Sequence, residues 1–167
     1  MDEVVYLSLG SNVGDRDRNL REAIRALGEV GRVKAVSSFY ETEPVDFVDQ
    51  AWFLNCAVAM ESLLRPEQMM AELLRLERKM GRERIHRKGP RTIDIDILMF
   101  GERIVDSPNL KIPHPAMQGR RFVLAPLAEI APEAKHPVMK RTVRELLAEL
   151  PERQVVRKLR GSGESIP

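Results

Sequence analysis

The segment "GPRTIDIDILMF", residues 89–100, decides the fold because it places two aspartates inside a strongly apolar run. Successive side chains of a strand point to opposite faces, so Asp94 and Asp96 share one face and the intervening isoleucines share the other. The Cα atoms of the two aspartates would lie roughly 6.5 Å apart, twice the rise per residue of a strand. Two carboxylates this close repel each other and lose solvation when the face is covered. The segment predicts a core strand with one apolar face and one acidic face.

The apolar pattern on either side of this strand predicts a β-α-β-β-α-β order with extra helices at the C-terminal end. This order is typical of a ferredoxin-like α+β sandwich with an antiparallel sheet. We expect one domain over residues 1–155 and a disordered tail over residues 156–167. The expected elements are strands over Val4–Leu9, Arg32–Thr42 and Phe53–Glu61, a short return strand around Ile104, and helices beginning near Asp15, Pro66, Arg121 and Thr142.

Composition and charge exclude several classes of protein. The chain has 27 basic and 25 acidic side chains, and a net charge of +2 does not favour nucleic acid or an anionic membrane as the main partner. A single cysteine, Cys56, excludes an intrachain disulfide and suits a reducing compartment. The sequence shows neither a signal peptide nor an apolar run of the ~20 residues that span a bilayer. We therefore expect a cytoplasmic globular domain.

Two interpretations of the aspartate pair stay open on the residue pattern. Both carboxylates could face solvent with salt-bridged neighbours, or they could hold a hard cation such as Mg²⁺, which prefers oxygen ligands and open positions for phosphate. The preceding segment "RERIHRKGPR", residues 82–91, holds five Arg or Lys residues. A cationic segment followed by two carboxylates suits a nucleoside triphosphate, because metal and arginines together neutralise its charge.

Other signatures of phosphate and metal chemistry are missing from the sequence. The "GSNVGD" turn, residues 10–15, matches neither the phosphate-binding loop nor the dinucleotide-binding fingerprint. No Cys or Ser stands out as an activated nucleophile, and the three histidines lack zinc-site spacing. The chemistry should be direct transfer between two bound substrates.

Six motifs in order resemble the 6-hydroxymethyl-7,8-dihydropterin pyrophosphokinase family from about Val4 to about Leu150. The motifs are "LGSN", "SSFYETEPV", "FLNCAV", "RKGPRTIDIDILMFG", "IPHPAM" and "RRFVLAPLAEIAP". The resemblance implies a ferredoxin-like enzyme of folate biosynthesis that transfers pyrophosphate from ATP, its co-substrate, to the pterin's hydroxymethyl group and releases AMP. Phe53 stands where the family often has Tyr, and Lys88 where it often has Trp.

The resemblance also implies a set of site residues. Two Mg²⁺ ions are expected on Asp94 and Asp96, and these aspartates would act in catalysis with Arg82 and Arg91. The expected ATP site consists of Glu77, Arg82, Arg84, Arg91, Ile97, His114 and Arg120. The expected pterin site consists of Thr42, Glu43, Pro44, Val45, Phe53, Asn55, Asp94 and Phe122. In that site the two phenylalanines would sandwich the ring, and the Asn55 carboxamide would read its amide edge.

The alternative function is a non-catalytic ferredoxin-like module that binds nucleotide or RNA. Against RNA binding, no aromatic RNA-binding strand motif is present, and two acids on a sheet face repel phosphate unless metal is bound. A sensor that binds ATP without transfer is a second alternative. The expected partners are therefore the two small substrates, without nucleic acid or membrane, while association with other folate enzymes stays open.

Overall fold

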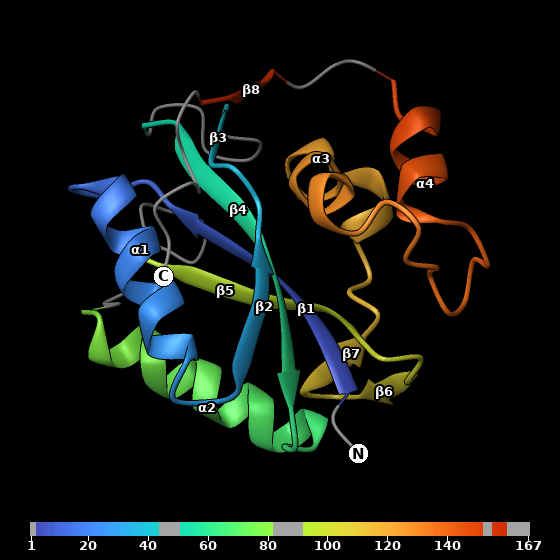
Figure 1. The fold of residues 1–167 in the computed structure, drawn as a ribbon, viewed down its shortest axis with the longest axis horizontal. Helices are drawn as coiled ribbons and strands as arrows, with labels where there is room; N and C mark the ends of the chain where they lie inside the picture. Colours follow the sequence, from blue (N-terminus) through green and yellow to red (C-terminus); the bar gives the residue numbers. More distant parts are fainter. Residues whose placement is uncertain (1–2, 44–50, 82–91, 152–154, 160–167) are drawn as a thin grey trace.

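Antiparallel pairing organises the strands into one main sheet and one small hairpin (Figure 1). The computed structural model describes residues 3–43, 51–81, 92–151 and 155–159. Its strands are β1 (Glu3–Ser11), β2 (Arg32–Val36), β3 (Tyr40–Thr42), β4 (Phe53–Ser62), β5 (Asp94–Phe100), β6 (Val105–Ser107), β7 (Leu110–Ile112) and β8 (Val156–Lys158). Its helices are α1 (Arg16–Leu27), α2 (Pro66–Lys79), α3 (Arg121–Ile130) and α4 (Val143–Glu149), with a 3₁₀ turn η1 (Met117–Gly119).

The main sheet has the order β5-β1-β4-β3-β8, and β2 also pairs with β4. β1 lies between β4 and β5, and both pairings are antiparallel. The predicted ferredoxin-like α+β architecture, with extra helices at the C-terminal end, is confirmed.

Helices cover both faces of the sheet (Figure 1). The apolar faces of α1 and α2 pack with the buried isoleucines of the acidic strand and with alternate residues of β1 and β4. On the opposite face, α3 and α4 enclose a second apolar cluster with Ala57, Leu98 and Met99. Leu98 and Met99 are neighbours on the same face because the β1–β5 register shifts between Tyr6 and Leu7. The acidic face of β5 is therefore the face that carries α3 and α4.

Local sequence signals explain where the helices begin. The Asp15 side chain accepts a hydrogen bond from the Arg18 backbone N–H at the start of α1. Pro66 is the first residue of α2, where its missing N–H is not needed. At the start of α4, Thr142 and Glu145 exchange side chain to backbone hydrogen bonds in a capping box, and the helix begins near Thr142 as predicted.

The single strand expected over Arg32–Thr42 is wrong, since two strands form there. The Ser37 hydroxyl interrupts the ladder: it accepts from the Ala57 N–H at 2.8 Å and donates to the Ser38 carbonyl at 2.7 Å. The Ser37 hydroxyl thus accepts the Ala57 N–H, which a backbone carbonyl would accept in a continuous strand. β2 and β3 therefore pair separately with β4.

The short return strand expected around Ile104 is confirmed as β6, which begins at Val105 and pairs with the unpredicted β7 in a separate hairpin. One further expectation needs correction. Val156–Lys158, placed by sequence in a disordered tail, forms β8 and pairs with β3. Three-residue strands are too short for a periodic pattern, and only the folded chain shows their partners.

No described helix is long and apolar enough to cross a membrane. The described helices instead use their apolar faces for packing on the sheet.

One polar side chain, Glu129 of α3, connects its helix to the β2–β3 junction by hydrogen bonds. The Tyr40 hydroxyl donates to its Oε1 at 2.6 Å, and the Ser38 N–H and hydroxyl donate to its Oε2 at 2.9 and 3.1 Å.

Glu129→Gln should lower the free energy of unfolding at pH 7 by about 1–2 kcal/mol, because hydrogen bonds to a charged acceptor become hydrogen bonds to a neutral one. Burial alone would raise the pKa of Glu129, but the hydrogen bonds from Tyr40 and Ser38 lower it overall. The stabilisation is therefore present above the ordinary carboxyl pKa of about 4.3 and is lost as the pH falls through the lower folded pKa. Urea unfolding of both proteins between pH 7 and pH 3 measures the difference.

The matched control is Glu133→Gln, which neutralises an exposed carboxylate paired with Arg144. We expect this control to change stability by less than about 0.5 kcal/mol. Equal free energies of unfolding for wild type and Glu129→Gln at pH 7 would show that the hydrogen bonds to the charged Glu129 carboxylate do not stabilise the fold.

Candidate active site

One row of paired residues in the sheet places Asp94 of β5 and the Asn55 carboxamide of β4 on either side of one β1 residue. Gly10 of β1 pairs with Asn55 on one side and with Asp94 on the other. Directly paired residues project from the same face of a sheet, so these three positions face α3 together. Asp94 and Asn55 are separated by two strand spacings, roughly 10 Å between Cα atoms.

The glycine between them leaves space on the sheet. A Cβ added to Gly10 would lie 2.5 Å from Asn55 Oδ1 and 3.4 Å from Phe53 Cδ1. No real Cβ contact is as short as the first of these distances. The Asn55 carboxamide and the Phe53 ring therefore lean over the backbone of Gly10, which only glycine permits.

The Asn55 side chain is buried, and its orientation is fixed by a neighbour. Its Nδ2 donates to Thr42 Oγ1 at 2.6 Å. Thr42 in turn pairs with Phe53, so all three side chains project from the same face at the end of β4. Sequence reasoning placed these three residues in one site, and the structure brings them together.

The second row holds Asp96 opposite Ser8, which pairs with Ala57 on its other side. Asp94 and Asp96 are half-buried, as predicted for the acidic face, whereas Ile95 between them is 6% exposed. The described residues contain no group of three or more His, Cys, Asp or Glu side chains that could enclose a metal. Two carboxylates on one strand hold an ion from one side only, which leaves positions for water and substrate oxygens. This donor set fits Mg²⁺.

His114, after β7, lies beside the acidic strand. Its backbone N–H donates to the Leu98 carbonyl at 2.9 Å. Burial and then the nearby Arg120 guanidinium lower the pKa of His114, while the Asp94 carboxylate opposes this shift. His114 Nδ1 accepts from the Ala116 N–H at 3.1 Å, so the neutral ring carries its proton on Nε2. This imidazole is a hydrogen-bond donor at neutral pH.

Arg120 is the N-cap residue of α3, and Phe122 lies in the first turn of this helix. The Arg120 guanidinium carbon lies 5.6 Å from the centre of the Phe122 ring. Phe122 packs against the apolar cluster on the α3 face, the same face as Phe53. The expected sandwich of a flat ring between Phe53 and Phe122 stays a prediction.

Two expected ATP residues lie on the opposite face. The Ile97 side chain is 5% exposed in the core beneath α1 and α2, so only its backbone is available to a ligand. Glu77 of α2 is 2% exposed, and its Oε2 accepts from the Ile95 N–H at 2.7 Å. Glu77 thus holds the peptide unit between the two aspartates.

Glu43 is engaged with the C-terminal segment. Its N–H donates to the Val155 carbonyl at 3.3 Å, and its Oε1 accepts from the Val155 N–H at 2.9 Å. The remaining expected site residues, Pro44, Val45, Arg82, Arg84 and Arg91, lie outside the described residues.

Sequence reasoning missed Gly10 and Ser8 as members of the site. Both belong to β1, and the alternating apolar residues of this strand indicated only the opposite face, which packs against α1 and α2. The signal available for Gly10 was the "LGSN" motif at the end of that strand. Its partners became known only through the strand register.

A family model described as 7,8-dihydro-6-hydroxymethylpterin-pyrophosphokinase (HPPK) matches residues 6–132. The 2-amino-4-hydroxy-6-hydroxymethyldihydropteridine pyrophosphokinase of Bacillus subtilis is 44% identical over 137 residues, which cover 81% of this chain and 82% of the relative. The protein of the same name from Pseudomonas aeruginosa is 41% identical over 153 residues, 90% and 94% of the two chains. The folic acid synthesis protein fol1 of Pneumocystis carinii is 42% identical over 138 residues, which cover 82% of this chain and 19% of that protein.

The fold also matches solved structures. Plasmodium falciparum HPPK-DHPS wild type with pteroate aligns with a TM-score of 0.71 at 17% identity, covering 89% of this chain and 44% of that chain. This chain therefore spans less than half of that protein. At such low identity the likeness concerns the fold, and it agrees with the ferredoxin-like architecture.

The proximity of His114, Asp94 and Arg120 predicts how His114 titrates. Asp94→Asn removes the negative charge that raises the pKa of His114, so this pKa should fall further. Arg120→Gln removes the positive charge that lowers it, so the pKa should rise. Histidine proton resonances followed by NMR from pH 4 to pH 8 in metal-free buffer report both shifts.

His136 serves as the internal control for this titration. Burial lowers the pKa of His136, and neither Asp94 nor Arg120 contributes to that shift. Its titration should be the same in all three proteins. An unchanged His114 titration in Asp94→Asn would show that the two groups are not neighbours.

Proposed function

Since the chain belongs to the 7,8-dihydro-6-hydroxymethylpterin-pyrophosphokinase family, we propose that it transfers pyrophosphate from ATP to 6-hydroxymethyl-7,8-dihydropterin in folate biosynthesis. The hydroxymethyl oxygen forms a bond to the β-phosphorus, and the bond from the β-phosphorus to the oxygen bridging to the α-phosphorus breaks. AMP leaves, the pterin carries the pyrophosphate, and the hydroxyl proton is released. The names of the relatives do not favour a non-catalytic nucleotide- or RNA-binding module.

The row Asp94–Gly10–Asn55 carries the proposal. Carboxylates suited to a phosphate-bound cation lie on one side of a bare glycine, and a fixed carboxamide lies on the other. The separation of roughly 10 Å, two strand spacings, accommodates a flat heterocycle whose hydroxymethyl arm points toward the aspartates. A site of this shape joins a nucleotide half to a pterin half.

In the nucleotide half, Asp94 and Asp96 would hold two Mg²⁺ ions. Bound Mg²⁺ supplies charge neutralisation of the triphosphate and of the transition state. Arg120 contributes a fixed positive charge beside the aspartates, and His114 donates a hydrogen bond from Nε2 to a phosphate oxygen. Arg82, Arg84 and Arg91 complete this half by sequence resemblance. The Ile97 backbone offers contacts to the nucleotide, and Glu77 positions the strand.

In the pterin half, Asn55 reads the amide edge of the ring because a carboxamide donates and accepts hydrogen bonds at once. Thr42 fixes the carboxamide, and Phe53 and Phe122 provide aromatic surfaces. Backbone groups of residues 43–45 contribute further polar contacts by resemblance. Most of the rate enhancement would come from aligning the hydroxymethyl oxygen with the β-phosphorus in a site of fixed charges.

The proposed setting is the cytoplasm, with the two small substrates as partners. Cys56 is a free, buried thiol, which suits a reducing compartment. The fusion of this fold within Plasmodium falciparum HPPK-DHPS supports association with other folate enzymes. The modest net charge of +2 gives no support for nucleic acid or membrane partners.

The direct test is an assay for AMP with 6-hydroxymethyl-7,8-dihydropterin and ATP, with and without magnesium. We expect AMP and pterin pyrophosphate in equal amounts, dependent on both the pterin and the metal. Release of ADP, or AMP formation that does not require the pterin, would overturn the proposal.

Asp94→Asn and Asp96→Asn should each reduce kcat by on the order of 10³ while the fold is retained, because each removes a carboxylate from the cation site. Turnover with saturating Mg²⁺ and circular dichroism provide the two measurements. Asp106→Asn is the matched control, since it neutralises an exposed aspartate that pairs with Lys111. Near-normal turnover in either site variant would remove the basis for the metal assignment.

Gly10→Ala should raise the KM for the pterin by at least about tenfold, because the new methyl group displaces the Asn55 carboxamide and breaks a buried hydrogen bond. The KM for ATP should change much less. Gly119→Ala provides the control, since its added Cβ meets nothing within 4 Å. A pterin KM equal to that of wild type would show that the close approach of Asn55 does not matter.

A further inference from the structure

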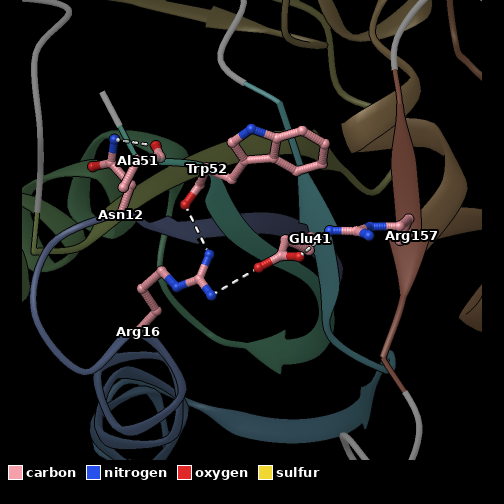
Figure 2. A network of polar contacts seen from close by, with 6 residues as sticks. All are labelled: Asn12, Arg16, Glu41, Ala51, Trp52 and Arg157. Atoms are coloured by element: carbon pink, nitrogen blue, oxygen red, sulfur yellow. Dashed lines mark hydrogen bonds and ion pairs between the residues drawn. The ribbon is translucent and has the colours of Figure 1, made fainter. Parts of the chain in front are cut away.

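A cluster of polar and charged residues surrounds Glu41 (Figure 2). Glu41 is the neighbour of Thr42 in β3, so its side chain projects from the face opposite the pterin half. The Arg16 Nη2 donates to Glu41 Oε2 at 2.8 Å, and the Arg157 Nη2 donates to Glu41 Oε1 at 2.6 Å. Each carboxylate oxygen thus holds one arginine, the first from α1 and the second from β8. The hydrogen bond and charge of Arg16, followed by those of Arg157, lower the pKa of Glu41 although burial raises it, so the carboxylate is charged at neutral pH.

The same arginines hold the residues that lead into β4. Arg16 Nη1 donates to the Trp52 carbonyl at 2.9 Å, and Asn12 Nδ2 donates to the Ala51 carbonyl at 3.2 Å. The Arg157 guanidinium carbon lies 5.1 Å from the centre of the Trp52 ring. Figure 2 shows α1, β3, the start of β4 and β8 meeting at these side chains.

The position of this cluster in the strands connects it to the pterin half. Glu41 directly precedes Thr42, and Trp52 directly precedes Phe53. Thr42 and Phe53 are paired across β3 and β4, and Asn55 donates to Thr42 from the same face. Fixing Glu41 and Trp52 from behind therefore fixes the backbone from which the three pterin residues project.

β8 contributes to this arrangement from the far end of the chain. Arg157 pairs directly with Glu41, and Val156 pairs with Thr42. Arg157 lies 25 residues beyond the end of the family match at residue 132. Its side chain is 62% exposed, so it has little packing role, whereas Glu41 is 20% exposed.

We propose that Arg157 is a positioning residue for the pterin half of the site, acting through Glu41 and Trp52. It touches neither substrate. By holding β3 and the start of β4 in one alignment, it raises pterin affinity and leaves the nucleotide half unaffected. This inference rests on the proposed function for the identity of the ligand.

Steady-state kinetics of Arg157→Gln test the proposal. We expect the KM for the pterin to rise about three- to fivefold, as expected when an exposed ion pair is lost, with kcat and the KM for ATP within twofold of wild type. Arg157→Lys should recover only part of the affinity, because an ammonium group still pairs with Glu41 but does not replace the planar guanidinium over the Trp52 ring. Partial unfolding would lower kcat alone, since it reduces the amount of active enzyme and leaves KM unchanged.

Lys158→Gln is the matched control on the same strand. The Lys158 side chain is 58% exposed and pairs with Glu129 at 3.7 Å. It projects from the face of the sheet opposite to Arg157, its neighbour in β8. If β8 acted only through general stability, both variants would change alike. A normal pterin KM in Arg157→Gln, or equal shifts in the two variants, overturns the proposal.

Calorimetry separates this inference from the proposed function. Binding of the hydroxymethyl pterin is measured with magnesium and α,β-methylene-ATP, in which the scissile bridging oxygen is replaced. If wild type binds the pterin but forms no AMP, the proposed function fails, and weaker binding by Arg157→Gln still supports the positioning role. If wild type does not bind the pterin, both fail.

Discussion

The pairing register of β5, β1 and β4 is the constraint on which the site depends. It sets Asp94, Gly10 and Asn55 side by side and sends the isoleucines of β5 to the opposite face. A shift by one residue would turn the aspartates into the apolar core beneath α1 and α2. The burial of the isoleucines therefore stabilises the same register that assembles the polar site. Stability and function share one strand and use opposite faces of it.

Side chains outside the proposed substrate contacts hold the backbone of the candidate site in place. Glu77 holds the peptide unit between the aspartates, and Thr42 holds the carboxamide of Asn55. Glu41 and its two arginines hold the backbone of the proposed pterin half from the opposite face of the sheet. Glu41, Glu77 and Thr42 each accept a hydrogen bond from a neighbouring donor, so their burial costs little. The rigid elements around them restrict the rotamers of the residues in the candidate site.

The sequence predicted the parts of the fold that follow from local rules. The alternation of Asp and Ile predicted both the strand and its faces, and the helices expected to begin near Asp15 and Thr142 are present. The break at Ser37 could not be predicted, because a hydroxyl that replaces a backbone acceptor leaves the strand-like composition intact. β8 was missed because its partner, β3, lies more than a hundred residues earlier in the chain. The aspartates, Asn55, Thr42 and Phe53 were placed together by resemblance, whereas the role of Gly10 required the register.

Glu77 has one more consequence, which concerns self-association. β5 lies at the edge of the main sheet among the described strands, and its sequence is rich in isoleucine. Such an edge offers unpaired amides to another copy of the chain and invites strand addition or fibril growth. A carboxylate from α2 already occupies the Ile95 amide, so an incoming strand would have to displace a buried anion. The contact that holds β5 in place is therefore also an obstacle to strand addition at this amide.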